Sequence, residues 1–175
     1  MMIRHGDVCI RNAEPADAAR LAAWWNDGRV MAHAGFPLGL GLSAEEAAEQ
    51  LAAGSEESGR VLLIAYQDQP IGEMNYRNLG DGTVEIGIKI CESAYQDRGL
   101  GRVFLSLLIR ALFERGCSRI VLDTNLKNRR AQHVYELLGF EKLRVNENAW
   151  RDQLGEYQSS VDYALTPDRF RDYAR

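Results

Sequence analysis

Apolar and polar residues alternate along several segments in the first half of the chain, which is the period of a β-strand. The clearest example is Thr83–Cys91, where every second side chain is apolar. Strands are also expected at Arg60–Tyr66, which is a dense apolar run, and at Ile71–Arg77, which lies between two turns. Their hairpin-sized connections predict antiparallel neighbours. The other expected strands are Val8–Arg11, Ile120–Leu122, Phe140–Val145 and Gln158–Leu165.

The apolar period changes to that of a helix after residue 100. Apolar side chains recur every three or four residues along Gly101–Arg115, which predicts an amphipathic helix. Because this helix separates Thr83–Cys91 from Ile120–Leu122, we expect those two strands to be parallel. Further helices are expected at Glu14–Asn26, Ser43–Gly54 and Asn128–Leu138, and an irregular segment at 28–42. Together the elements predict one α/β domain over residues 1–175, with helices flanking a mixed sheet of six or seven strands.

Composition and charge exclude several classes of protein. Hydrophobic residues make up 46% of the 175 residues and charged residues 26%, the ordinary mixture of a globular protein. No apolar run approaches the roughly 20 residues of a membrane span, and the first residues lack the apolar core of a signal peptide. We therefore expect a cytoplasmic protein with no membrane partner. A net charge of −4 and a pI near 5.4 disfavour a nucleic-acid partner. Three widely separated cysteines argue against a disulfide framework and against a metal site.

The segment Gln96–Arg102 lies where a strand is followed by a helix, and it contains Gly99 and Gly101. Backbone N–H groups at a helix N-terminus have no partners within the helix and attract anions. A glycine lacks the Cβ atom that would keep a phosphate away from the main chain. The segment has neither the third glycine of a dinucleotide-binding turn nor the Gly-Lys-Ser/Thr ending of a P-loop. On these residues alone it is either an anion-binding turn or a tight turn with helix-permissive glycines.

Two motifs together resemble the GNAT (GCN5-related N-acetyltransferase) family. Gln96–Gly101, read as Q-x-x-G-x-G, is similar to the family signature Q/R-x-x-G-x-G/A. Asn128–Phe140, read as N-x-x-A-x-x-x-Y-x-x-x-G-F, is similar to the second cofactor-facing helix of the family and the strand after it. The early Arg11–Asp17 segment also resembles the opening of many members. The resemblance covers nearly the whole chain. It implies the GNAT acyl-CoA N-acyltransferase fold, with acetyl-CoA (coenzyme A) as acyl donor and Gln96–Gly101 as its pyrophosphate anchor.

The resemblance implies roles for two side chains. Acyl transfer from a thioester releases a thiolate, whose conjugate acid has a pKa of about 8.5, and a tyrosine at the position of Tyr135 serves as general acid. A protonated amine must lose a proton before it attacks, and an acidic residue at the position of Glu85 takes it through a water chain. The implied function is direct transfer of the acetyl group to a primary amine in a ternary complex. From the residues alone, Tyr135 could instead be a core aromatic side chain and Glu85 a solvated carboxylate.

Positive charge gathers around the predicted cofactor site, at Arg98, Arg102, Lys127, Arg129 and Arg130. Such a rim suits the pyrophosphate and the 3′-phosphate of coenzyme A. The resemblance further implies that the main chain around 88–90 binds the pantetheine arm and polarises the thioester carbonyl. The predicted cofactor-binding residues are Ile88, Lys89, Ile90, Gln96, Asp97, Arg98, Gly99, Leu100, Gly101, Arg102, Asn128 and Arg130. Asn128 could equally act as the N-cap of its helix.

The acceptor amine is expected to contact the first two helices, their connection, and the loop between the last two strands. Trp24–Asp27 and Trp150–Asp152 resemble the subgroup that contains ribosomal-protein N-terminal acetyltransferases and aminoglycoside 6′-N-acetyltransferases. The candidate substrate-binding residues are Trp24, Trp25, His33 and Phe36, with core packing as the alternative for the tryptophans. These residues do not distinguish a small-molecule acceptor from a peptide. A strand edge near the C-terminus would allow a homodimer.

Three other interpretations were weighed against direct transfer. A non-catalytic acyl-CoA-binding or sensor module would retain the fold without turnover. An acyl-enzyme on Cys91 with His133 as base is disfavoured, because His133 projects from a different helix face than Tyr135. A nucleotide-dependent phosphotransferase is disfavoured, because the sequence has no P-loop and no metal-binding pair of carboxylates.

Overall fold

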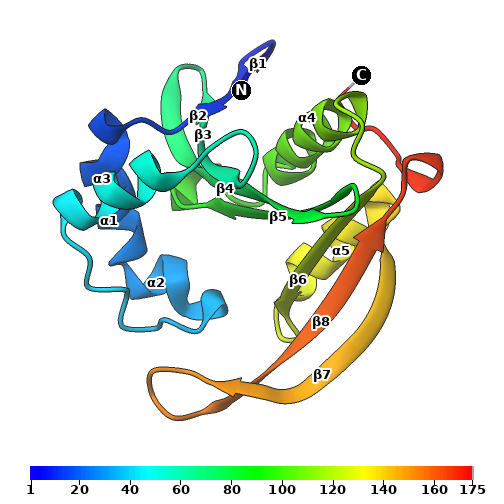
Figure 1. Ribbon diagram of the computed structural model, residues 1–175. Helices are drawn as coiled ribbons and strands as arrows, with labels where there is room; N and C mark the ends of the chain where they lie inside the picture. Colours follow the sequence, from blue (N-terminus) through cyan, green and yellow to red (C-terminus); the bar gives the residue numbers. More distant parts are fainter. Residues whose placement is uncertain (175) are drawn as a thin grey trace.

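In residues 1–174, which the computed structural model describes, eight strands form one sheet in the order β1-β2-β3-β4-β5-β6-β8-β7 (Figure 1). β5 and β6 run parallel, and the other neighbouring pairs run antiparallel. The mixed α/β architecture is as predicted, with one strand more than expected. The strands are β1 (Met2–His5), β2 (Val8–Asn12), β3 (Gly59–Tyr66), β4 (Gln69–Gly80), β5 (Thr83–Ile90), β6 (Arg119–Asn125), β7 (Glu141–Arg151) and β8 (Tyr157–Leu165).

Helices cover both faces of this sheet (Figure 1). They are α1 (Ala18–Trp25), α2 (Gly28–Met31), α3 (Ala44–Ala53), α4 (Leu100–Glu114) and α5 (Arg129–Leu138). One core lies under α4 and α5, where Phe104 and Leu108 pack with Ile86 of β5. A second core lies under α1 and α3, where Leu21 packs with Leu63 of β3. Full burial of such a side chain contributes about 1.5–3 kcal/mol. No helix in residues 1–174 is long and apolar enough to cross a membrane.

Several helix boundaries follow from local sequence, as predicted. Ser43 and Glu46 form a reciprocal capping box at the start of α3, with N···O distances of 2.8 and 3.1 Å. The side chain of Asn128 caps α5 by accepting a hydrogen bond from Ala131 N at 3.2 Å. Gly139 ends α5 in the left-handed region, with φ of +97°.

Three elements differ from the predictions. β1 is absent from them because most of its side chains are exposed and show no apolar alternation, so pairing with β2 alone makes it a strand. β7 continues to Arg151, well beyond the predicted end at Val145, because it pairs with β8 although nearly all its side chains are exposed. The segment 28–42 contains α2 and a 3₁₀ turn at Ala32–Ala34. Asp27 caps α2 by accepting from Arg29 N.

Candidate functional site

The sheet opens between β5 and β6. In the described part of the chain, the two strands pair with each other only over Thr83–Glu85 and Arg119–Val121, although they continue to Ile90 and Asn125. Beyond that point β5 stays bonded to β4 and β6 to β8, and Figure 1 shows β5 and β6 diverging. We call this opening the wedge. Strand edges that part in this way leave N–H and C=O groups in need of partners. An elongated ligand can therefore bond to the main chain inside the wedge.

The predicted anion-binding segment follows β5 directly. Gln96 Nε2 donates to Ile90 O at 2.8 Å and ties the segment to the end of the strand. Gly99 precedes the first turn of α4 with φ of +75°, a conformation that glycine adopts without strain. A Cβ atom built on Gly101 would have its nearest neighbour, Ile90 Cδ1, 3.8 Å away. No protein side chain within residues 1–174 caps this helix, so its first N–H groups are free to bind an anion.

Three guanidinium groups surround this helix start. Arg130 Nη1 lies 3.0 Å from both carboxylate oxygens of Asp97, which joins α5 to the loop. Arg98 stacks over the ring of Tyr95 at 5.6 Å, and Arg102 over the ring of Tyr173 at 5.4 Å. All three arginines are exposed, so their charges can reach a phosphate. The loop, the helix start and the cations together fit a diphosphate such as that of coenzyme A.

Tyr135 of α5 is buried under the wedge-forming strands. Its ring packs against Phe140 and Tyr163, with centroids 5.8 and 5.7 Å away. Its residue exposure is 6%, and burial, followed by the charges of Asp123 and Tyr163, raises the pKa of the phenol. The phenol therefore stays protonated and remains a donor near neutral pH.

The hydroxyl of Tyr135 has no hydrogen-bond partner among residues 1–174. In that part of the chain, the fully buried side-chain polar atoms that form no hydrogen bond are Asn12 Oδ1 and Arg60 Nε, the latter 3.2 Å from Glu56 Oε1. The hydroxyl of Tyr135 is not one of them. It therefore keeps access to solvent despite the burial of its ring. A buried tyrosine usually finds a partner for its hydroxyl, so this free donor marks a place where a ligand can supply one.

A cleft of about 270 Å³ lies on the opposite face of the sheet, where β5 and β6 part. Glu85 of β5 and Asp123 of β6 lie on this face, and Asp162 of β8 is the direct cross-strand neighbour of Asp123. The cleft is lined by Glu85, Val121, Leu122, Asp123, Leu143, Asp162 and Tyr163. Tyr135 and the carboxylates thus approach the wedge from opposite faces of the sheet.

The three carboxylates of the cleft differ in their partners. Glu85 Oε2 lies 2.6 Å from Arg77 Nη2 of β4. Asp162 accepts hydrogen bonds from Arg144 Nε at 2.8 Å and from Asn146 Nδ2 at 3.0 Å. Asp123 forms no ion pair within residues 1–174, and part of its side chain remains open to solvent. Partial burial, followed by the negative charges of Glu85 and Asp162, raises the pKa of Asp123.

Asp123 was not among the residues singled out from the sequence. The predicted strand ended at Leu122, one residue too early, because the apolar run ends there. The available signal was the predicted parallel pairing of these two strands. The register itself comes from the structure: it sets Glu85 opposite Val121 and therefore places Asp123 on the same face. Only the continuation of β6 to Asn125 makes that deduction possible.

The candidate acceptor residues fall into two groups. Trp24 and Trp25 are 7% and 6% exposed, and their indole N–H groups donate to Glu92 at 2.8 Å and to Glu73 at 3.0 Å. Both tryptophans therefore pack in the core beneath α1. His33 and Phe36 lie on the exposed connection after α2, where a ligand can reach them.

Lys89 of β5 and Trp25 share a buried partner, Glu73. The Lys89 ammonium lies 2.9 Å from Glu73, whose side chain is 4% exposed. The two opposite charges cancel, and the pair links β5 to β4 at Lys89, between Ile88 and Ile90. Because Glu85 and Asp162 are paired with arginines, the excess negative charge of the cleft comes from Asp123.

An acyl-enzyme on Cys91 is contradicted by the structure. Burial, followed by the charge of Glu73, raises the pKa of Cys91 to about 12, whereas a nucleophilic cysteine needs a lowered pKa. The thiol donates to Lys89 O, and His133 is exposed on α5. Cys91 therefore acts as a small core residue.

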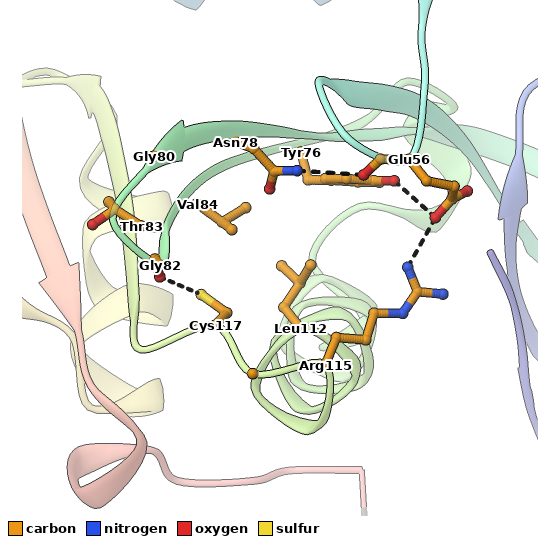
Figure 2. A pocket seen from close by; sticks show the side chains of 11 residues that line it. Glu56, Tyr76, Asn78, Gly80, Gly82, Thr83, Val84, Leu112, Arg115 and Cys117 are labelled. Carbon is orange, nitrogen blue, oxygen red and sulfur yellow. Dashed lines mark hydrogen bonds and ion pairs between the residues drawn. The ribbon is translucent and has the colours of Figure 1, made fainter.

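A second cleft, of about 300 Å³, lies at the opposite end of α4, beside the β4–β5 turn (Figure 2). Its polar groups bind one another. Glu56 accepts hydrogen bonds from Tyr76 at 3.2 Å and from Arg115 at 3.0 Å, and Cys117 donates to Gly82 O at 3.3 Å (Figure 2). It shares no lining residue with the cleft at the wedge, so it is not part of the candidate site.

Comparisons with known proteins agree with this geometry. The sequence model of the acetyltransferase (GNAT) domain matches residues 7–141. The [ribosomal protein bS18]-alanine N-acetyltransferase of Haemophilus ducreyi is 30% identical over 74 residues, which is 42% of this chain and 51% of that protein. The matched part thus spans about half the length of that curated relative.

Solved structures share the whole fold. A spermidine N-acetyltransferase from Vibrio cholerae, in complex with CoA and spermine, has a TM-score of 0.84 at 19% identity, over 94% of this chain and 98% of that one. A ribosomal L7/L12 alpha-N-protein acetyltransferase in complex with coenzyme A has a TM-score of 0.81 at 17% identity, over 97% and 99%. At these identities the likeness concerns the fold alone.

Proposed function

The chain belongs to the acetyltransferase (GNAT) family, and we propose that it transfers the acetyl group of acetyl-CoA directly to a primary amine. The observation that carries the proposal is the wedge between β5 and β6, with a free helix start at one end and functional groups on both faces. Bound there, acetyl-CoA supplies the activated acetyl group as a thioester. The residues of this chain bind the phosphates, orient the thioester, and accept or donate the protons.

The cofactor-binding residues follow the anion-binding geometry. The N–H groups at the start of α4, framed by Gly99 and Gly101, bind the diphosphate, and Arg98, Arg102 and Arg130 neutralise its charge. The main chain of Ile88–Ile90 has no strand partner on the wedge side within residues 1–174, although Ile90 O accepts from Gln96 Nε2. This stretch bonds the pantetheine arm, and one N–H polarises the thioester carbonyl. The remaining proposed contacts are Gln96, Asp97, Leu100 and Asn128.

Two carboxylates compete for the role of general base. Glu85 is held by Arg77 at 2.6 Å, so its carboxylate is already engaged in an ion pair. Asp123 has no such partner within residues 1–174, and its pKa is raised. A base is most effective when its pKa approaches the working pH. We therefore propose Asp123 as the group that takes the proton of the amine, with Glu85 orienting it by charge.

Tyr135 is proposed as the general acid. Its hydroxyl lacks a partner among residues 1–174, stays protonated, and lies on the face opposite the carboxylates. It can donate to the leaving thiolate while the amine attacks from the cleft side. Separation of acid and base on two faces keeps Tyr135 from protonating the incoming amine.

The acceptor proposed is a cationic primary amine. The cleft holds three carboxylates against two arginines, Arg77 and Arg144, which leaves an excess negative charge. Spermidine and the N-terminal amines of ribosomal proteins appear in the names of similar proteins. Those two kinds of amine are the first to test, and His33 and Phe36 are the accessible candidates to contact them.

Thiol release from acetyl-CoA tests the proposal. Purified protein is incubated with acetyl-CoA and, separately, with spermidine, an aminoglycoside, free amino acids and a peptide beginning with alanine. We expect thiol release with at least one amine, and none without an amine. A non-catalytic acyl-CoA sensor would instead bind acetyl-CoA in calorimetry and release no thiol with any acceptor. Failure to bind acetyl-CoA at all would contradict both functions.

A further inference from the structure

The turn between β7 and β8 contacts the connection between α2 and α3, more than 110 residues earlier in the chain. Gln153 Nε2 donates to Gly39 O at 2.8 Å, and Gln153 Oε1 accepts from Leu38 N at 2.9 Å. One amide side chain thus bonds the N–H of Leu38 and the C=O of the next residue, Gly39. Figure 1 shows the tip of the β7–β8 hairpin reaching toward α2.

A second contact lies beside the first. Gly35 has φ of +92°, and a Cβ atom built on it would lie 2.8 Å from Trp150 Nε1. The indole of Trp150 therefore lies directly on the main chain at Gly35, and Gln153 N donates to Gly35 O at 3.4 Å. Two contact points a few residues apart fix the orientation of segment 35–39 relative to the hairpin.

Both partners of this contact are anchored. Asp152 Oδ1 accepts from Leu154 N at 2.9 Å and from Glu156 N at 3.0 Å, which shapes the turn. Its Oδ2 accepts from Gln158 at 2.8 Å, and Gln158 bonds Asn125 of β6 at 3.1 Å. The turn is thereby attached to the strand that carries Asp123. On the other side, Asn26 closes the connection by two hydrogen bonds to Leu42, at 2.7 and 2.9 Å.

We propose that Gln153 is a positioning residue that holds segment 35–39 against the β7–β8 hairpin and thereby pre-forms one wall of the acceptor site. The inference rests on the proposed function, because it concerns the amine that function consumes. His33 and Phe36 lie in or beside the held segment, on the same face as the carboxylate cleft. Without Gln153, an acceptor must order this segment as it binds, which weakens binding of the amine. Loop 96–101 makes none of these contacts, so acetyl-CoA binding does not depend on them.

Hydrogen exchange and steady-state kinetics test the proposal together. The variants are Gln153→Ala, which loses both bonds, and Gln153→Glu, which keeps the acceptor for Leu38 N and loses the donor to Gly39 O. Leu154→Ala is the matched control, because its side chain is 61% exposed in the same turn. Amide exchange over residues 32–42 is measured without substrate, the dissociation constant for coenzyme A by calorimetry, and kinetics with whichever of spermidine or an alanine-initiated peptide the wild type acetylates.

The expected pattern separates positioning from general damage. Exchange over 32–42 rises in Gln153→Ala and less in Gln153→Glu, while Leu154→Ala matches the wild type. The KM for the amine rises about 5- to 30-fold in Gln153→Ala, in line with the loss of one exposed and one partly buried hydrogen bond. The kcat and the dissociation constant for coenzyme A stay within about twofold of the wild type.

Other outcomes overturn the inference. Unchanged exchange in Gln153→Ala would show that the amide does not hold the segment. Raised exchange with an unchanged KM for the amine would show that the held segment does not shape the acceptor site. If no tested amine is acetylated by the wild type, the proposed function fails instead, and the exchange comparison still decides whether Gln153 holds the segment.

Discussion

The two sides of the wedge are built differently. On the cofactor side, the anion-binding loop depends on neighbours in sequence, such as the bond from Gln96 to Ile90 O six residues away. On the acceptor side, the cleft and its wall join residues from distant segments, such as Asp123 with Asp162 and Gln153 with Gly39. The proposed phosphate site is main-chain geometry that a short motif encodes. The proposed amine site consists of side chains that only the folded chain assembles.

Tyr135→Phe should have the largest effect. It tests the acetyl-transfer step, in which the cofactor on one side of the wedge reacts with the amine on the other. Removal of a general acid typically slows a reaction by about 10²- to 10⁴-fold. We expect kcat to fall in that range with an unchanged dissociation constant for coenzyme A, because the ring packing remains. Tyr66→Phe, which removes a hydroxyl from a partly buried ring against Tyr95, is the control. An unaltered kcat in Tyr135→Phe would exclude the general-acid role.

Asp123→Asn and Glu85→Gln test which carboxylate on the acceptor side acts as the general base. We expect Asp123→Asn to lower kcat/KM about 100-fold and Glu85→Gln to lower it less. Because the pKa of Asp123 is raised, the wild-type rate should fall with decreasing pH at a higher pH than an ordinary aspartate would cause. The acid limb of the pH profile should disappear in Asp123→Asn. If it disappears in Glu85→Gln instead, Glu85 is the base.

The same raised pKa predicts the sign of the stability change. A carboxylate whose pKa is higher in the folded state destabilises that state once pH rises above its unfolded value, and the penalty is fully present at neutral pH. Asp123→Asn should therefore leave the Tm at pH 7 unchanged or slightly higher. A large fall in Tm would mean that its loss of activity reflects folding.

Gly101→Val probes the cofactor side alone. The protein leaves room at this position, with its nearest atom 3.8 Å from a built Cβ, so the fold should tolerate the change. A phosphate approaching the N–H groups, however, should collide with the added side chain. Loss of one or two charge-assisted hydrogen bonds predicts about 10- to 100-fold weaker binding of coenzyme A with a nearly unchanged Tm. Calorimetric titration and thermal unfolding measure the two. Unchanged binding would place the phosphates elsewhere.

Glu56→Gln should change neither cofactor binding nor turnover of the amine, and it should have the smallest effect of these variants. Burial opposes the charge of Glu56, but hydrogen bonds and cations, Arg115 among them, lower its pKa to about 2. Since the ordinary value is 4.5, its stabilisation is present above pH 4.5 and is lost as pH falls toward 2. Allowing for its exposure, we expect a Tm about 2–4 °C lower at pH 7, with the difference shrinking in acid. A changed kcat would show that the second cleft is coupled to the wedge.

The periodic segments were the most predictable part of the fold. β5, with every second residue apolar, and α4, with apolar residues at helical spacing, were found at nearly their observed bounds. β1 and most of β7 were not, because exposed edge strands carry no apolar pattern and are defined by their partners. The prediction for β6 ended too early, at Leu122, because the apolar run ends there, and Asp123 was missed as a result.

The sequence by itself determined the family, the crossover between two parallel strands, and the loop Gln96–Gly101, because helix starts, glycine conformations and apolar periods are local properties. The tertiary structure alone decided which carboxylates share a cleft and which of them has no cationic partner among residues 1–174. It also showed that both tryptophans are buried and that the hairpin is bonded to segment 35–39. Those features depend on strand register and on contacts between distant residues, which no local pattern specifies.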